Sequence, residues 1–440
     1  MKRISLVPIL LYMLLILSGC EFKSGDNLLQ APQPSKTYEA LQKQLDAIAE
    51  DDMAPVSPQS GQSRTTVQLV DLDQDGEDEV IAFFGETKKP DQFHVYIFEK
   101  KNDSYVMRGD ITGTGVHIAS VAYPTLTPTG ERGIALSWKM GGDNPSSRLT
   151  VCSFSGGKVK TLLETTYHSM ITAKLDDSGA DNLILFTADA SGRRIAQMYG
   201  YAGGSLALRG ETSLAPEVQT IVSLKTGGLR GERTAVFAEG KPELGAGLMT
   251  DILIYDDKGF RNLALEGENM SDQGTYRPVS VPATDVNADQ LIEVPRAVPM
   301  QGTSSADTTY MLDWYAYSTE HKPERVTTTY QNVSENWQLV LSDIWREQVT
   351  VSKGTSEGMA TTTFSEYRAA GKPVPLLTIY RLTGDMRSFY AARDHMIFLG
   401  QTQTEIFTAT IPESAAESTI ALDQETIKQQ FSVITQSWNN

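Results

Sequence analysis

The clearest chemical signal in the chain is a nine-residue acidic segment at positions 71–79. Carboxylates at alternate positions of a tight loop converge on one point, and a glycine at the sixth position lets the chain reverse direction. An oxygen cage of this kind suits Ca²⁺. The expected ligands are the side chains of Asp71, Asp73, Asp75 and Glu79, together with the backbone carbonyl of Glu77.

An EF-hand is excluded for this loop. Its twelfth position must carry a bidentate acid, and here that position is Ala82, inside the apolar run from Val80 to Phe84. The loop therefore belongs to a β-hairpin and not to a pair of helices. Its crowded acids repel one another unless a cation neutralises them. The alternative is a solvated acidic turn that closes a hairpin without any metal.

The acidic pattern recurs at four later points, at intervals of about fifty residues, each time before an apolar run. The last copy keeps all four oxygen positions, so a second calcium site is expected at 285–293. The third copy keeps Asp176, Ser178 and Asn182, with Lys174 in first position, where its ammonium would replace the metal. The copies at 125–133 and 223–231 have lost nearly every ligand. The ligands expected in the last copy are Asp285, Asn287, Asp289 and Glu293, and the five turn positions are Gly76, Gly130, Gly179, Gly228 and Gln290.

Each repeat must hold its loop between strands. The run after each loop is apolar on both faces, as in Val80–Phe84 and Leu183–Phe186, which is typical of a central strand. An aromatic hairpin follows, with turns such as Gly156-Gly157 and Gly203-Gly204. Loop, strand and hairpin together predict a four-stranded antiparallel sheet. The expected fold is mainly β, with a β-propeller of about five such blades over residues 63–331.

These repeats resemble the FG-GAP and VCBS-type repeats of integrin α-subunit propellers, over about 270 of the 440 residues. In those families the DxDxDGxxE loop binds calcium, and the resemblance implies the same here. The first repeat, at 71–79, is the one that matches this motif throughout. Five repeats are fewer than the seven blades of integrin propellers.

The N-terminal residues have the pattern of a targeting signal. Lys2 and Arg3 precede an apolar stretch from Leu6 to Leu17, as in a signal peptide over residues 1–20. Leu17-Ser18-Gly19-Cys20 resembles the lipobox of bacterial lipoproteins, in which the cysteine thiol is acylated, with palmitate among the acyl groups. The resemblance implies a chain anchored outside the cytoplasm through lipid on Cys20. The alternative is an ordinary secretory signal with a chance cysteine. Residues 21–62 are expected to form a tether with a short helix.

The net charge of the chain limits the kinds of partner that it is expected to bind. The chain has 38 basic and 55 acidic residues, a net charge of −17, and loss of Lys2 and Arg3 with the signal peptide would make it −19. Such a surface excludes nucleic acid as a partner and attaches to a membrane through lipid, not through a basic face. The remaining cysteine, Cys152, is expected to be a small buried hydrophobe. Trp138 and Trp314 are expected to pack in the core.

Residues 332–440 are expected to form a separate α+β domain. It would end in an amphipathic helix that starts at Asp423, because four apolar residues follow at helical spacing: Ile427, Phe431, Ile434 and Trp438.

The chain contains no GxSxG, HExxH, P-loop or strand-to-helix GxGxxG motif, and its five histidines have no zinc-ligand spacing. The hypothesis is a monomeric, surface-anchored lipoprotein whose calcium-stabilised propeller binds an extracellular protein, peptide or glycan. The first alternative is an extracytoplasmic hydrolase or lyase acting on glycans, with its site in the propeller channel. A structural or sensory lipoprotein without a small-molecule ligand is the third possibility.

Overall fold

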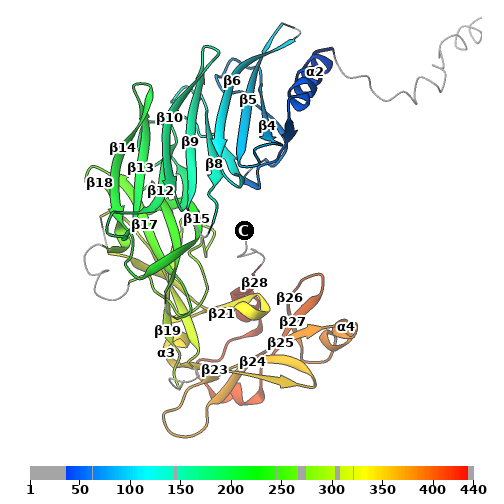
Figure 1. The fold of residues 1–440 in the computed structure, drawn as a ribbon. Coiled ribbons are helices and arrows are strands. Elements are labelled where there is room, and N and C mark those ends of the chain that lie inside the picture. Colours follow the sequence, from blue (N-terminus) through cyan, green and yellow to red (C-terminus); the bar gives the residue numbers. More distant parts are fainter. Residues whose placement is uncertain are drawn as a thin grey trace, which may run out of the picture. The chain divides into compact units, whose positions relative to one another are not determined.

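The computed structural model describes residues 36–61, 63–102, 104–142, 146–243, 245–265, 274–302, 308–320 and 322–434. The expected signal peptide, residues 21–35 and 62 of the expected tether, His321 and Trp438 lie outside these ranges. The described chain is mainly β, built from successive antiparallel sheets (Figure 1). It divides into two compact units. The first holds the described residues up to Ser57 with Thr65–Val70 and Glu77–Gly113, and the second holds the rest.

The first unit is one sheet with a helix packed on it. Leu41 of the helix is buried in a cluster with Phe84, Tyr96 and Phe98 of the sheet, because its apolar residues fall on one face. Residues 80–83 of the central strand are fully buried, as their continuous apolar run predicts. The elements are α2 (Lys36–Glu50), β1 (Met53–Pro55), β3 (Val67–Val70), β4 (Glu79–Glu86), β5 (Gln92–Lys101) and β6 (Ser104–Thr114), and the sheet order is β1-β4-β5-β6, with β3 also paired to β4.

The second unit continues with three more sheets of the same plan. A two-residue strand, β2 (Ser60–Gly61), pairs in parallel with β7 at the edge of the second sheet. Within each sheet the strands pair in the order of the chain. The second sheet contains β7 (His117–Ala122), β8 (Gly133–Lys139), β9 (Ser147–Ser155) and β10 (Lys158–Tyr167); the third contains β11 (Ser169–Ala173), β12 (Asn182–Ala188), β13 (Arg194–Ala202) and β14 (Ser205–Ser213); the fourth contains β15 (Val218–Leu229), β16 (Arg233–Pro242), β17 (Met249–Asp256) and β18 (Gly259–Asn262).

Neighbouring sheets of the second unit share hydrophobic cores. Leu149 of the second sheet is buried in one cluster with Leu183 of the third. Phe186 of the third sheet is buried with Val236 of the fourth, and Phe237 of the fourth with Val294 of the fifth. Four-stranded antiparallel sheets that follow one another and pack face to face are the arrangement of β-propeller blades. Closure of the sheets into a ring stays a prediction.

The expected fourth loop, at 223–231, is wrong. Residues 218–229 form strand β15. The chain turns after the end of this strand, at Gly231 and Glu232, which have φ of 87° and 58°. Gly228 is a strand residue that forms a parallel bridge with Leu291. A Cβ atom on the adjacent Gly227 would lie 2.2 Å from Cγ1 of Ile292, so these glycines are needed for close approach of a neighbouring segment and not for chain reversal.

The fifth sheet crosses the expected domain boundary at residue 332. Strand β22 follows β21 in the chain and pairs with it. Strand β28, near the C-terminal end of the described chain, then pairs with the other edge of β22. The last sheet has the order β23-β24-β25-β27-β26. The elements are β19 (Glu293–Pro299), β20 (Tyr310–Ala316), β21 (Glu324–Asn332), β22 (Trp337–Leu341), α3 (Asp343–Gln348), β23 (Val349–Ser356), β24 (Met359–Glu366), β25 (Val374–Thr383), α4 (Arg387–Ala391), β26 (Ile397–Gln401), β27 (Glu405–Thr410), α5 (Gln424–Gln430) and β28 (Phe431–Val433).

The expected C-terminal helix is shorter than its periodicity indicates. Asp423 caps α5 by accepting a hydrogen bond from the N–H of Thr426 at 2.8 Å, but the helix ends at Gln430. Phe431 then starts strand β28 and stacks on Trp337, with ring centroids 5.8 Å apart. Pairing with β22 replaces further helix because it gives the backbone a sheet partner and buries Phe431.

Two further expectations about the core are confirmed. Trp138 and Trp314 are fully buried, and each indole N–H donates to a threonine hydroxyl of the next strand. Cys152 is fully buried, and burial raises the pKa of its thiol to about 11, so it is a packing residue and not a nucleophile. Among the described residues no helix is long and apolar enough to cross a membrane.

Candidate metal centres

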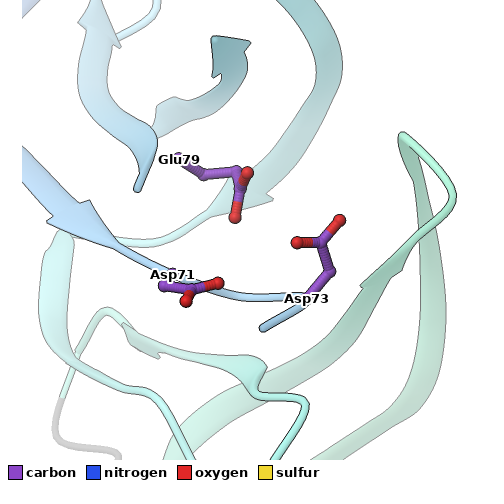
Figure 2. A group of neighbouring side chains, drawn as sticks. All are labelled: Asp71, Asp73 and Glu79. Carbon is purple, nitrogen blue, oxygen red and sulfur yellow. The ribbon is translucent and has the colours of Figure 1, made fainter. Parts of the chain in front are cut away.

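The first acidic loop brings three carboxylates together. Asp71, Asp73 and Glu79 each offer one oxygen, and these oxygens lie within 4.8 Å of one another. Figure 2 shows the three carboxylate groups turned toward a common space. Glu79 is buried, while the two aspartates are partly exposed. Such a set of hard oxygen donors fits a calcium ion.

Two other expected ligands of this loop lie outside the group. The side chain of Asp75 is exposed. The carboxylate of Glu77 forms an ion pair with Lys100, with Oε2 2.6 Å from Nζ. Because its carboxylate is paired, Glu77 would ligate a metal through its backbone carbonyl, as the sequence predicts.

The last acidic loop forms a second group. Oxygens of Asp285, Asp289 and Glu293 lie within 4.8 Å of one another. Asn287 lies beside them, because its Nδ2 donates to Oδ2 of Asp289 at 2.9 Å and its Oδ1 accepts from the N–H of the same residue at 3.2 Å. The donor set is again one of carboxylates with a neutral amide oxygen nearby, which suits Ca²⁺.

Both loops make the same turn. The first aspartate accepts a hydrogen bond on Oδ2 from the backbone N–H five residues later: Gly76 donates to Asp71 at 3.2 Å, and Gln290 donates to Asp285 at 2.8 Å. The fourth and sixth positions have positive φ in both, with Gln290 at 71° where the first loop has glycine at 90°. A glutamine tolerates this left-handed conformation at modest cost, so the turn persists without the glycine.

Glu293 is the buried member of its group. It is fully buried, its Oε2 accepts from the N–H of Val286 at 3.0 Å, and its Oε1 is buried without a hydrogen-bond partner. Burial raises the pKa of this carboxyl to about 7, and the charges of Asp289 and Asp285 act in the same direction. A buried carboxylate oxygen without a donor is unfavourable unless a cation faces it. The unsatisfied oxygen therefore fits a metal ligand.

In the third loop an amide stands where the fifth loop has a buried carboxylate. Asn182 occupies the position of Glu293, and its Oδ1 accepts from the N–H of Leu175 at 2.9 Å, as Glu293 does from Val286. Its Nδ2 donates to Oδ2 of Asp176 at 2.9 Å. The amide therefore fills the role that we expected for Lys174. Lys174 itself is exposed and, in the part of the chain that the structure describes, forms no ion pair.

The acidic loops also join consecutive repeats through their backbones. The eighth loop residue donates its N–H to a carbonyl of the preceding repeat in three cases: Arg132 to Leu72 at 2.7 Å, Asp181 to Thr125 at 2.7 Å and Ile292 to Gly228 at 3.0 Å. Asp181 also accepts from the N–H of Thr125 at 2.8 Å. A cation held by such a loop would stiffen a junction between repeats.

Sequence reasoning missed a buried ion pair near the fifth loop. Arg277 and Glu239 are buried, with Nη2 2.7 Å from Oε2. The other oxygen of Glu239 accepts from the N–H of Ala283 at 2.6 Å, and Arg277 also donates to the hydroxyl of Thr250 at 2.9 Å. The two residues are 38 positions apart, and neither belongs to a motif, so no local signal joins them.

No family model matches the chain, and no curated protein matches it. The FG-GAP likeness thus rests on the loop motif alone. Solved structures with a similar outline include the β-propeller domain of the Trilobed protease from Pyrococcus furiosus, at 11% identity and TM-score 0.27, covering 72% of this chain and 91% of that one. The exotype rhamnogalacturonan lyase YesX has 11% identity and TM-score 0.27, covering 71% and 61%. Saccharomyces cerevisiae Sqt1 has 10% identity and TM-score 0.28, covering 76% and 92%.

Proposed function

We propose that the chain is a surface-anchored lipoprotein whose two complete acidic loops bind calcium and thereby hold its repeats in place for binding an extracellular protein, peptide or glycan. The observation that carries the calcium part is Glu293, which has one buried oxygen without a donor and belongs to a group with two further carboxylates. The backbone hydrogen bonds between repeats supply the reason why calcium would matter for the whole binding surface.

Calcium titration of the full chain, extracted with its anchor in detergent, tests the metal proposal. Calorimetry should find two sites. Asp73→Asn should remove one site and Asp285→Asn the other, whereas Asp177→Asn should keep both, because Asp177 is an exposed acid of the third loop. At a hundredfold excess over its dissociation constant each ion should add about 2.7 kcal/mol to the free energy of unfolding. If both variants still bind two calcium ions, these loops are not the calcium sites.

The lipid anchor rests on Cys20, which lies outside the described residues, and is tested in cells. Metabolic labelling with an alkyne analogue of palmitate should mark the wild-type chain. Cys20→Ser should abolish the label and move the protein from the membrane fraction to the medium or periplasm. Membrane retention of unlabelled Cys20→Ser would contradict the anchor.

The binding role is tested with defined ligands. A panel of peptides and cell-wall glycans is incubated with the protein in calcium, and both retention and product formation are measured. Retention that disappears with chelator, without turnover, supports the interaction module. Turnover of a glycan would instead support the hydrolase or lyase.

A further inference from the structure

A small pocket lies between the third and fourth sheets, away from the acidic loops. Its volume is about 190 Å³, and it is lined by residues at the start of β11 and β13, the end of β12 and the start of β15. Phe186, Leu214 and Val218 are buried and form its apolar wall. The polar residues of the lining are His168, Ser169, Thr187, Arg194, Gln219 and Thr220.

Arg194 is the unusual member of this lining. It is partly buried, yet in the described part of the chain its guanidinium makes no ion pair and no side-chain hydrogen bond. Two other partly buried arginines are paired with carboxylates: Arg261 with Asp256 at 2.6 Å and Arg346 with Asp313 at 2.6 Å. In a chain with 55 acidic and 38 basic residues, a half-buried arginine without a carboxylate is a cation that lacks its partner.

His168 adds a second unsatisfied group. Its Nδ1 is buried without a hydrogen-bond partner, and its Nε2 lies 3.3 Å from Oγ of Ser146. Burial, and after it the charge of Arg194, lowers the pKa of His168 and favours the neutral imidazole, while a contact with the backbone of Phe186 acts in the opposite direction. The pocket therefore carries one positive charge and an imidazole nitrogen able to donate a hydrogen bond.

The ligand class follows from charge, shape and size. One guanidinium matches one carboxylate, because its planar fork makes two parallel hydrogen bonds to the two oxygens. The apolar wall suits a short aliphatic chain on that carboxylate. Pockets for drug-sized ligands measure about 300–1,000 Å³, so this one is limited to a smaller molecule. We infer that the pocket formed by His168, Arg194 and Phe186 binds a small monocarboxylate with an aliphatic chain.

Calorimetry of the full chain with 4-methylpentanoate tests this inference. Binding of wild type should saturate, and Arg194→Gln should weaken it about tenfold or more, since a charged hydrogen-bond partner is lost. Arg193→Gln is the matched control: the neighbouring Arg193 is exposed, pairs with Asp189 and does not line the pocket. Thr187→Val, which keeps the shape and removes one hydroxyl, should weaken binding less than Arg194→Gln does.

Chemical controls separate the carboxylate from other ligands. The amide 4-methylpentanamide should bind at least tenfold more weakly than the acid, and inorganic phosphate should not displace the acid. A tripeptide ending in leucine has the same terminal carboxylate, so tighter binding of the peptide than of the free acid would assign the pocket to peptide C-termini. Equal affinity of acid and amide, or an unchanged affinity in a folded Arg194→Gln, overturns the inference. It does not depend on calcium, and failure here leaves the loop sites untouched.

Discussion

Glu293 and Val286 share one hydrogen bond, in which the backbone N–H of Val286 donates to Oε2 of the carboxylate at 3.0 Å. The other oxygen, Oε1, is buried with no donor. In the third repeat Leu175 and Asn182 make the equivalent bond, and there the second atom of the side chain is an amide nitrogen that donates to Asp176. The same position thus carries an amide with both atoms hydrogen-bonded in one repeat and a carboxylate with one unsatisfied oxygen in the other.

Glu293→Gln should have opposite effects on stability with and without calcium. In chelator the neutral amide keeps an acceptor for Val286 and removes a buried charge, so the free energy of unfolding should rise by about 1 kcal/mol or more. In calcium the variant lacks a ligand and should be less stable than wild type. Denaturant unfolding in both conditions measures this. Glu164→Gln, an exposed glutamate on β10, is the control, and a change of the same sign in both conditions would contradict the site.

Asn182→Asp should make the third loop dependent on a cation. Two carboxylates then face each other where an amide donated to Asp176 at 2.9 Å, so the midpoint of thermal unfolding should fall in chelator. Calcium should restore part of the loss. The double variant Asp176→Asn/Asn182→Asp exchanges the two groups and should recover stability without metal. A double variant no more stable than the single one would disprove the amide's role.

Arg277→Met should be strongly destabilising, by about 3–5 kcal/mol, because it leaves Glu239 buried and charged without its partner. Glu239→Gln in the same chain removes that charge and should recover a large part of the loss. Denaturant unfolding of both single variants and the double variant forms the cycle. Additive losses would show that the two residues act independently.

Asp251 should make the stability of the fourth sheet depend on pH. It is fully buried, Oδ1 accepts from Ala215 and from Asn262 at 3.0 and 2.7 Å, and Oδ2 has no partner. Burial raises its pKa to about 6. A raised pKa means that the folded state holds the proton more tightly, so this stabilising contribution is complete below about pH 4 and is lost as the pH rises through about 6.

Asp251→Asn should remove that loss. Relative to wild type its free energy of unfolding should increase between pH 4 and pH 7, by an amount on the order of 3 kcal/mol. Urea unfolding across this range gives the difference. Asp257→Asn, at an exposed position in the β17–β18 turn, should show no such trend. A difference for Asp251→Asn that stays constant with pH would rule out titration of this residue.

The sequence alone predicted the elements whose causes are local. Acids at positions 1, 3 and 9 of a tight loop are close in space because the chain reverses between them, so Asp71, Asp73 and Glu79 come together as expected. Apolar runs such as Val80–Phe84 form buried central strands, as their continuous apolar pattern predicts. The repeating sheets followed from these units.

Two predictions were wrong because contacts between distant segments decided the local structure. Gly228 looked like a turn residue, but it is a strand residue that forms a parallel bridge with Leu291, in the loop before β19. Phe431 fitted a helical stripe, but pairing of β28 with β22 ended the helix at Gln430.

Tertiary structure likewise decided the groups that carry the remaining chemistry. Arg277 and Glu239 meet across 38 residues, and His168 and Arg194 line one pocket with a segment of β15. A sequence determines how nearby residues turn and which faces are apolar. Which charge is buried beside which partner depends on how the sheets pack, because only packing removes a group from water and fixes what it faces.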